Sequence, residues 1–147
     1  MKYTIPYKKI RPNAKAPFHA HGDDAGWDLY VSSVMPHLDG GFITFGSGLA
    51  FDFSSVGFAD ARPRSSVWKH GLILTNSAGV IDAGYRGEVC GVFYEINDNA
   101  TIYNVGERFL QLLFPQLGVD DTVEFVEVET LPSSSRGEGG YGSTGEK

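Results

Sequence analysis

The chain of 147 residues has the size of one ordinary domain, and its net charge of −6 excludes the broad basic face that binds nucleic acid. No stretch approaches the roughly 20 apolar residues of a membrane span, and the N-terminus lacks the apolar core of a signal peptide. The single cysteine, Cys90, excludes an internal disulfide and sits in an apolar run typical of a small buried residue. We therefore expect a cytoplasmic protein without nucleic-acid or membrane partners.

Short apolar runs recur along the chain, broken by Gly, Pro, Asn and Asp, and their β-branched and aromatic residues favour strands. The predicted strands cover residues 3–7, 27–31, 48–53, 57–61, 72–75, 89–96, 109–114 and 123–128. The best helix candidate is the short piece 65–70, with Ser65 as its cap. Many short strands at a spacing of roughly 8–12 residues predict an all-β sandwich, barrel or jelly roll.

Two predicted strands carry a polar residue of interest. Asp28 follows Asp24, but this pair lacks the dense oxygen spacing of a calcium loop. Gln111 interrupts an otherwise apolar run, and a buried amide needs polar partners. Those partners are either backbone groups of the core or phosphate oxygens of a ligand.

Arg64, Ser65 and Ser66 stand where a predicted strand gives way to the helix candidate. Amides and hydroxyls at the start of a helix bind anions, and an arginine adds a two-pronged donor suited to phosphate. In an acidic protein, such a local site favours a small anionic ligand over a polymer. The alternative is an ordinary capped helix beside a surface arginine.

The segment 76–88 is dense in residues with special chemistry. Glycines such as Gly79 permit tight turns and close ligand approach, while Asn76 carries the donor and the acceptor that reading a pyrimidine edge requires. Asp82 follows two β-branched residues, which places its carboxylate at the rim of the core, where it can orient and deprotonate a water molecule. The alternative is a hairpin with a turn-stabilising aspartate.

The last segment is rich in glycine and almost devoid of apolar residues. This change in composition divides the chain into a β domain, residues 1–131, and a flexible arm, residues 132–147. Composition alone favours a disordered tail. Yet Arg136, Tyr141, Ser143 and Thr144 are the parts of a segment that can close over an anion and stack on a base.

Taken together, five segments resemble the five motifs of the trimeric dUTP pyrophosphatase (dUTPase) family in order and spacing. They are residues 24–29, residues 63–66 with 69–72, residues 79–88, residues 106–108 with 111–112, and residues 136–145. The resemblance implies a jelly-roll-like β-clip fold and a homotrimer with the C-terminal tail exchanged between subunits. It also implies hydrolysis of dUTP to dUMP and pyrophosphate, which keeps uracil out of DNA and supplies dUMP for thymidylate synthesis.

The resemblance also assigns roles to residues of the β domain. Asp82 activates the water that attacks the α-phosphorus. Tyr85 packs under the deoxyribose and leaves no room for a 2′-hydroxyl. The triphosphate is held by Arg64, Ser65, Ser66 and Gln111, and the uracil and sugar are read by Asn76, Gly79, Val80 and Ile81.

The resemblance assigns the arm and the metal as well. Arg136 reaches the γ-phosphate, and Tyr141 stacks on the uracil ring. The terminal phosphates are surrounded by Gly142, Ser143 and Thr144. Mg²⁺ is held mainly by the triphosphate and water, with Asp28 at most an outer-shell support.

Two other functions stay open on the sequence. The related dCTP deaminase family shares the fold and the motif around Asp82, but it needs a glutamate on the following strand, where this chain has Val92. A non-catalytic trimeric nucleotide sensor on the same fold is the second alternative, because fold alone does not fix function. Trp68 has no assigned role, and packs either in the core or at the trimer interface.

Overall fold

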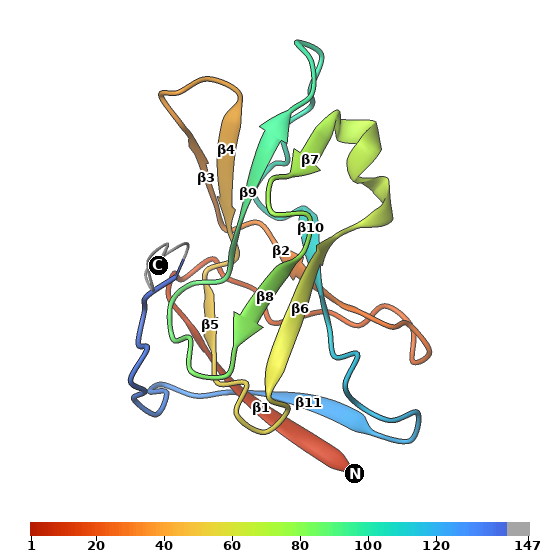
Figure 1. Ribbon diagram of the computed structural model, residues 1–147, viewed down its shortest axis with the longest axis vertical. Coiled ribbons are helices and arrows are strands. Elements are labelled where there is room, and N and C mark those ends of the chain that lie inside the picture. Colours follow the sequence, from red (N-terminus) through yellow and green to blue (C-terminus); the bar gives the residue numbers. More distant parts are fainter. Residues whose placement is uncertain (141–147) are drawn as a thin grey trace, which may run out of the picture.

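The computed structural model describes residues 1–140, which form eleven strands and one short 3-10 helix (Figure 1). The elements are β1 (Lys2–Lys9), β2 (Trp27–Tyr30), β3 (Ser33–Pro36), β4 (Phe42–Gly46), β5 (Leu49–Phe51), β6 (Phe58–Pro63), η1 (Ser65–His70), β7 (Leu72–Leu74), β8 (Gly79–Asp82), β9 (Cys90–Glu95), β10 (Arg108–Leu113) and β11 (Thr122–Glu127). Within residues 1–140, no helix has both the length and the apolar character needed to cross a bilayer.

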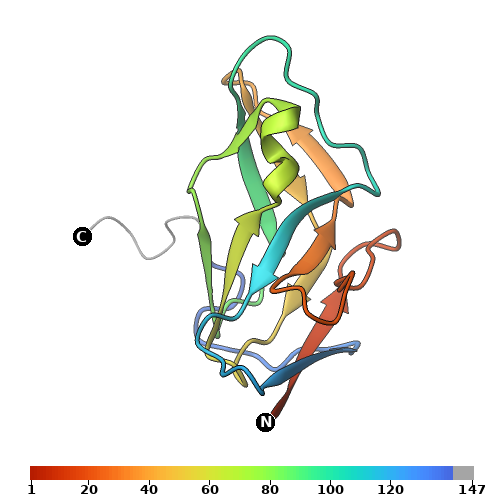
Figure 2. The same ribbon diagram turned by 90° about the vertical axis from the view of Figure 1, so that its right-hand side faces the viewer.

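The strands form three sheets, with the orders β11-β1-β5, β2-β10-β6-β8 and β3-β4-β9-β7. All pairings are antiparallel except that of β1 with β11. Figure 2 shows β1 and β11 at the base of the molecule and η1 near the opposite end, between β6 and β7. The strand β8 is an edge of its sheet, which becomes important for the site.

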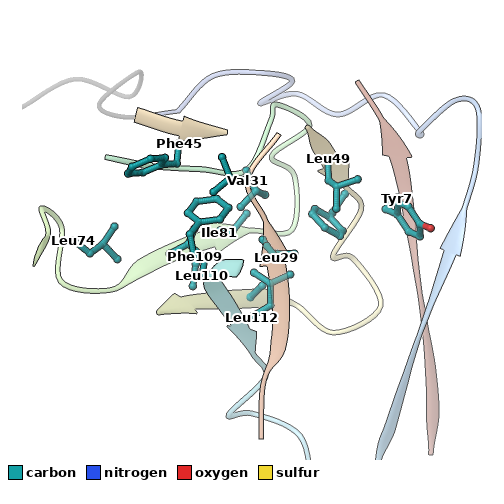
Figure 3. Packing of buried hydrophobic residues seen from close by; sticks show 14 of the residues in the cluster. Tyr7, Leu29, Val31, Phe45, Leu49, Leu74, Ile81, Phe109, Leu110 and Leu112 are labelled. Carbon is teal, nitrogen blue, oxygen red and sulfur yellow. The ribbon is translucent and has the colours of Figure 1, made fainter. Parts of the chain in front are cut away.

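The core is built from the inward faces of these sheets (Figure 3). In β4, Ile43 and Phe45 are buried while Phe42 and Thr44 point outward, the alternation expected of a half-buried strand. The Phe45 ring packs against Phe93 and Phe109 with centroid separations of 5.5 and 6.0 Å. Such aromatic packing fixes the frame on which the loops are carried.

The predicted all-β, jelly-roll-like fold is confirmed, and a strand is present in each of the eight predicted ranges. Sequence reasoning missed β3, β4 and β8. The helix candidate is present as η1, but its cap was wrong: Arg64 is the N-cap residue and makes no side-chain capping bond. The core alternative for Trp68 was also wrong, since its side chain is 70% exposed beside Lys69.

Candidate active site

A cavity of about 170 Å³ opens between β6, the edge strand β8 and the turn that follows β8. Seven of the predicted site residues line it: Asn76, Gly79, Val80, Ile81, Asp82, Tyr85 and Arg136. Sequence reasoning assigned no site role to five other residues of the wall: Ala61, Glu88, Val89, Cys90 and Gly140. The predicted nucleoside-reading residues and the predicted catalytic acid are thus brought together within one chain.

Edge position gives β8 free hydrogen-bonding groups. The strand pairs with β6 alone, with Asp82 opposite Phe58 and Gly79 opposite Ala61. Its outer N–H and C=O groups therefore have no partner strand within residues 1–140. A ligand edge with alternating donors and acceptors can take the place of that strand.

Asn76 stands beside the start of β8, in the turn that connects it to β7. Ser77 adopts a positive φ of 61°, and its amide donates to the carbonyl of Leu74 at 3.0 Å, which closes the turn. A methyl group added at Gly79 would lie 3.3 Å from the Asn76 amide nitrogen. Glycine at this position therefore lets the amide side chain lie close to the strand.

The Asp82 carboxylate stands at the pocket with 52% of its side chain exposed. Its Oδ2 atom lies 2.7 Å from Nη1 of Arg136. Asp82 therefore lies at the rim of the core, as predicted. An accessible carboxylate beside a cation can accept a proton from a bound water without first being released from the core.

Tyr85 is fixed by its hydroxyl, which donates to the Glu88 carbonyl at 2.8 Å. A methyl group at Gly87 would lie 2.5 Å from the Tyr85 hydroxyl, so the ring lies close against the backbone there. Burial, with smaller contributions from neighbouring acidic groups, raises the pKa of Tyr85. The ring is therefore a neutral, rigid wall of the pocket.

Glu88 joins the pocket wall to the N-terminal part of the chain. Its carboxylate accepts a two-pronged pair of bonds from Arg11, at 2.5 and 2.7 Å, and a third from the Gly48 amide at 2.8 Å. Burial acts to raise the pKa of Glu88, but the bonds from Arg11 and Gly48 outweigh it and the net shift is downward. The carboxylate is thus held charged in the wall.

Cys90 shows where the sequence interpretation was incomplete. The residue is half-buried and lines the cavity, whereas its apolar neighbours predicted a core position. Burial, aided by the charge of Glu88, raises the pKa of the Cys90 thiol to about 12. The thiol is therefore protonated at neutral pH and does not act as a nucleophile.

The first part of the predicted arm packs against the turn that follows β8 of its own chain, and the exchange of the tail between subunits stays a prediction. Gly137 forms a parallel bridge with Tyr85, and the Arg86 amide donates to the Gly137 carbonyl at 2.5 Å. The Ser134 hydroxyl donates to the Gly84 carbonyl. The predictions for Tyr141, Gly142, Ser143 and Thr144 fall outside the described residues.

A second cluster contains the predicted phosphate-binding residues. Asp28 on β2 forms ion pairs with two arginines. Its Oδ2 atom lies 2.9 Å from Nη1 of Arg108, and its Oδ1 atom lies 3.5 Å from Nε of Arg64. Gln111 on β10 lies opposite Asp28 and donates its amide to the Pro63 carbonyl at 3.1 Å. The backbone partner considered for Gln111 is therefore present, and its contact with ligand phosphate stays a prediction.

Next to this cluster lies an open depression of about 280 Å³ with a basic wall. It is lined by Arg64, His70, Tyr103, Gly106, Glu107 and Arg108. Ser65 and Ser66 begin η1 directly after Arg64, with Ser65 the more exposed. The two arginines suit an anionic group, and phosphate binding by Arg64, Ser65 and Ser66 stays a prediction.

The two clusters are far apart in one chain. Asp82 pairs with Phe58 at the beginning of β6, whereas Arg64 follows the end of that strand. Six residue steps of extended chain lead from Phe58 to Arg64, a span of about 20 Å at a strand rise of roughly 3.3 Å per residue. A triphosphate is much shorter than this separation along the backbone, which argues against one triphosphate lying across both clusters of a single chain.

Among residues 1–140, no group of three or more metal-ligating side chains is present. Both oxygens of Asp28 face arginines, so direct ligation of a cation by Asp28 would require those arginines to move. The arrangement fits a cation that arrives on a phosphate ligand, because Mg²⁺ is commonly held by substrate phosphates, water and few carboxylates.

Comparison with known sequences places these residues in context. The sequence model of the dUTPase family matches residues 12–145. Proteins named deoxyuridine 5′-triphosphate nucleotidohydrolase are similar over nearly the whole chain. That of Nocardia farcinica is 36% identical, covering 96% of this chain and 85% of the relative, and that of Clostridium tetani is 32% identical, covering 98% of both.

Solved structures show the same fold. The dUTPase of Staphylococcus bacteriophage 80alpha with dUpNHpp superposes with a TM-score of 0.62 at 24% identity, covering 97% of this chain and 98% of that one. A mutant dUTPase from phage phi11 of S. aureus, described with a structural Mg(II) ion, gives a TM-score of 0.59 at 20% identity, covering 74% of this chain and 88% of that one. The architecture is therefore shared with these proteins.

Proposed function

The chain belongs to the dUTPase family, and from this membership and the pocket geometry we propose that it hydrolyses dUTP to dUMP and pyrophosphate. The observation that carries the proposal is the accessible Asp82 carboxylate at a cavity walled by the edge of β8 and by Tyr85. A candidate general base, groups that can hydrogen-bond to the nucleoside and a ring that can pack against its sugar thus surround one cavity. The following steps assign these parts to the reaction.

Uracil is read by Asn76 and by the outer edge of β8. The uracil ring presents a donor between two acceptors, and cytosine presents a different pattern. The fixed backbone amides and carbonyls of Val80 and Ile81 match the pattern of uracil. Against cytosine, they leave hydrogen-bonding groups unpaired. This mismatch is the basis of the proposed preference for uracil.

Tyr85 selects deoxyribose. Its ring is immobilised by the bond to the Glu88 carbonyl and by the close approach of Gly87. A sugar packed on this ring meets a wall that does not yield to an added hydroxyl. UTP is therefore excluded by volume rather than by charge.

Asp82 acts as the general base. A water held by its carboxylate attacks the α-phosphorus and passes a proton to Asp82. The bond from this phosphorus to the oxygen that bridges to the β-phosphate breaks, and pyrophosphate leaves with that oxygen. Because Arg136 contacts Asp82 at 2.7 Å, triphosphate oxygens compete for the guanidinium, and its transfer to them leaves the base available.

Mg²⁺ neutralises charge on the triphosphate when it is bound. The chain contributes arginines and amides, while the phosphates and water supply most metal ligands. Asp28, already paired with Arg64 and Arg108, acts at most from the outer shell. This assignment agrees with the donor groups that the described residues offer.

A homotrimer with shared sites resolves the separation of the two clusters. About 20 Å separates Asp82 from Arg64 along β6. The triphosphate of a dUTP molecule that lies beside Asp82 of one copy is therefore held by Arg64 and Gln111 of another copy. The outer face of the sheet β3-β4-β9-β7 offers an apolar surface, where Phe42, Tyr94 and Ile73 form an exposed row. Such a surface supports association between copies.

A nucleotide panel tests the proposed function. The protein is incubated with Mg²⁺ and dUTP, UTP, dCTP or dTTP, and the products are identified by chromatography. We expect dUMP and pyrophosphate from dUTP and little turnover of the others. Binding of dUTP without dUMP formation would favour a nucleotide sensor, and ammonia release from dCTP would favour a deaminase.

A further inference from the structure

Arg86 occupies a nearly enclosed position in the turn that follows β8, with 11% of its side chain exposed. Its Nε atom donates to the Pro132 carbonyl at 2.7 Å, and Nη1 donates to the Ala83 carbonyl at 2.6 Å. A longer bond of 3.3 Å reaches the Tyr85 carbonyl. One guanidinium therefore bonds both the turn that carries Asp82 and the start of the arm.

Asp52 fixes the remaining face of this guanidinium. Its Oδ1 atom lies 3.0 Å from Nη2 of Arg86, and only 13% of its side chain is exposed. Burial acts to raise the pKa of Asp52, but hydrogen bonds from Ser54 and the charge of Arg86 outweigh it, and the net shift is downward. A charged carboxylate at the end of β5 thus anchors Arg86 to the core frame.

The main chain of Arg86 holds the arm a second time. Its amide donates to the Gly137 carbonyl at 2.5 Å, next to the bridge between Tyr85 and Gly137. The side chain and the main chain of one residue therefore fix the arm at Pro132 and at Gly137. Arg136, whose guanidinium contacts Asp82, lies between these two points.

We propose that Arg86 is a positioning residue for the reaction: anchored by Asp52, it sets the relative positions of the catalytic turn and of the arm that carries Arg136. A purely structural ion pair would explain the contact with Asp52. It would not explain three bonds to carbonyls of the two segments that meet at the site. The kinetic part of this inference rests on the proposed function, whereas the docking of the arm does not.

Kinetics of the full-length protein test the first part. Arg86→Ala should lower kcat by about 10-fold to 10²-fold, because misplacement of reacting groups by about 1 Å has effects of this size. The KM should change less than kcat, since Arg86 lines neither cluster. Arg86→Lys should fall between Arg86→Ala and wild type, because an ammonium keeps the charge but cannot reach all the carbonyls. Added guanidinium ion should partly restore Arg86→Ala, and Lys9→Gln, which removes an exposed ion pair, serves as control.

Limited trypsin digestion tests the docking of the arm without substrate. Cleavage of the Arg136–Gly137 bond, followed by mass spectrometry, should accelerate about tenfold in Arg86→Ala and Asp52→Asn, as expected when charged hydrogen bonds that hold a segment are lost. Wild-type rates of cleavage and an unchanged kcat in both variants would overturn the proposal. If Arg86→Ala does not fold, Asp52→Asn carries the same two measurements. If the variants show faster arm cleavage but the wild-type protein does not hydrolyse dUTP, the proposed function is refuted and the docking role of Arg86 stands.

Discussion

At the scale of single residues, the site separates two kinds of carboxylate. Asp82 is half exposed, and its cationic partner among residues 1–140 is Arg136. Glu88, a few residues away, is held by Arg11 and by the Gly48 amide. Asp82, which we propose accepts a proton, is accessible, whereas Glu88, which holds the pocket wall, is tied by several bonds. We therefore expect Asp82 to act in catalysis and Glu88 in stability.

Removal of the Asp82 charge should leave the affinity for dUTP nearly unchanged and abolish most of its hydrolysis. Asp82→Asn keeps the size of the side chain but cannot accept a proton from water. We expect kcat to fall by about 10²-fold to 10⁴-fold, the range for loss of a general base. Affinity for a non-hydrolysable dUTP analogue, measured by calorimetry, should change little. Asp39→Asn in the exposed loop between β3 and β4 is the control, and an unchanged rate in Asp82→Asn would exclude Asp82 from the mechanism.

Glu88 should contribute stability that depends on pH. Because its pKa is lowered in the folded state, the unfolded chain takes up the proton first as the pH falls. The contribution is complete above the ordinary pKa of about 4.3 and is lost as the pH falls through the lowered folded value. Glu88→Gln should therefore reduce the free energy of unfolding at pH 7 by about 1–3 kcal/mol, the range for charged hydrogen bonds.

Urea unfolding at several pH values from 7 to 3 measures this effect. The difference between wild type and Glu88→Gln should shrink as the medium becomes acidic. Glu124→Gln removes an exposed ion pair with Lys2 and should cost no more than about 1 kcal/mol. A Glu88→Gln difference that stays constant down to pH 3 would contradict the assigned role of the charge.

At the scale of elements, the arm should be dispensable for folding and essential for turnover. Among the described residues, the buried hydrophobic core ends at Leu131. Deletion of residues 136–147 should therefore leave the circular dichroism spectrum and the melting transition nearly unchanged. Loss of Arg136, and of the later arm residues that we propose contact the terminal phosphates, should lower kcat by about 10²-fold or more. Deletion of residues 146–147 alone is the control, and unfolding of the longer truncation would show a structural arm.

Much of the fold and of one half of the site follows from local sequence, and the rest does not. Runs such as 109–114 identify strands because all of their side chains are buried or partly buried, while the glycine-rich segment 76–88 identifies the pocket. The alternation in Phe42–Gly46 was present but short, and β3 and β8 are edge strands with exposed residues. Arg11 contacts Glu88 across 77 positions in sequence, and no local pattern encodes such a contact.

At the scale of the whole molecule, the proposed reaction requires more than one chain. The pocket with Asp82 and the cluster with Arg64 lie about 20 Å apart along β6, and we therefore propose that each chain contributes them to different sites. A symmetric assembly brings unlike halves together without any change in the fold. Light scattering should accordingly give the mass of three chains, and an active monomer would contradict shared sites.

Shared sites make a quantitative prediction for mixed assemblies. Asp82→Asn and Arg64→Ala should each be nearly inactive alone. After joint unfolding and refolding at equal amounts, a site is intact when its Asp82 comes from one variant and its Arg64 from the other, each with a chance of about one half, so about a quarter of wild-type activity should return. A mixture of Asp82→Asn with Tyr85→Ala should recover no activity beyond that of Tyr85→Ala itself, because these two residues line the pocket of the same chain. Equal recovery in both mixtures, or recovery in neither, would contradict the assignment of the two halves to different subunits.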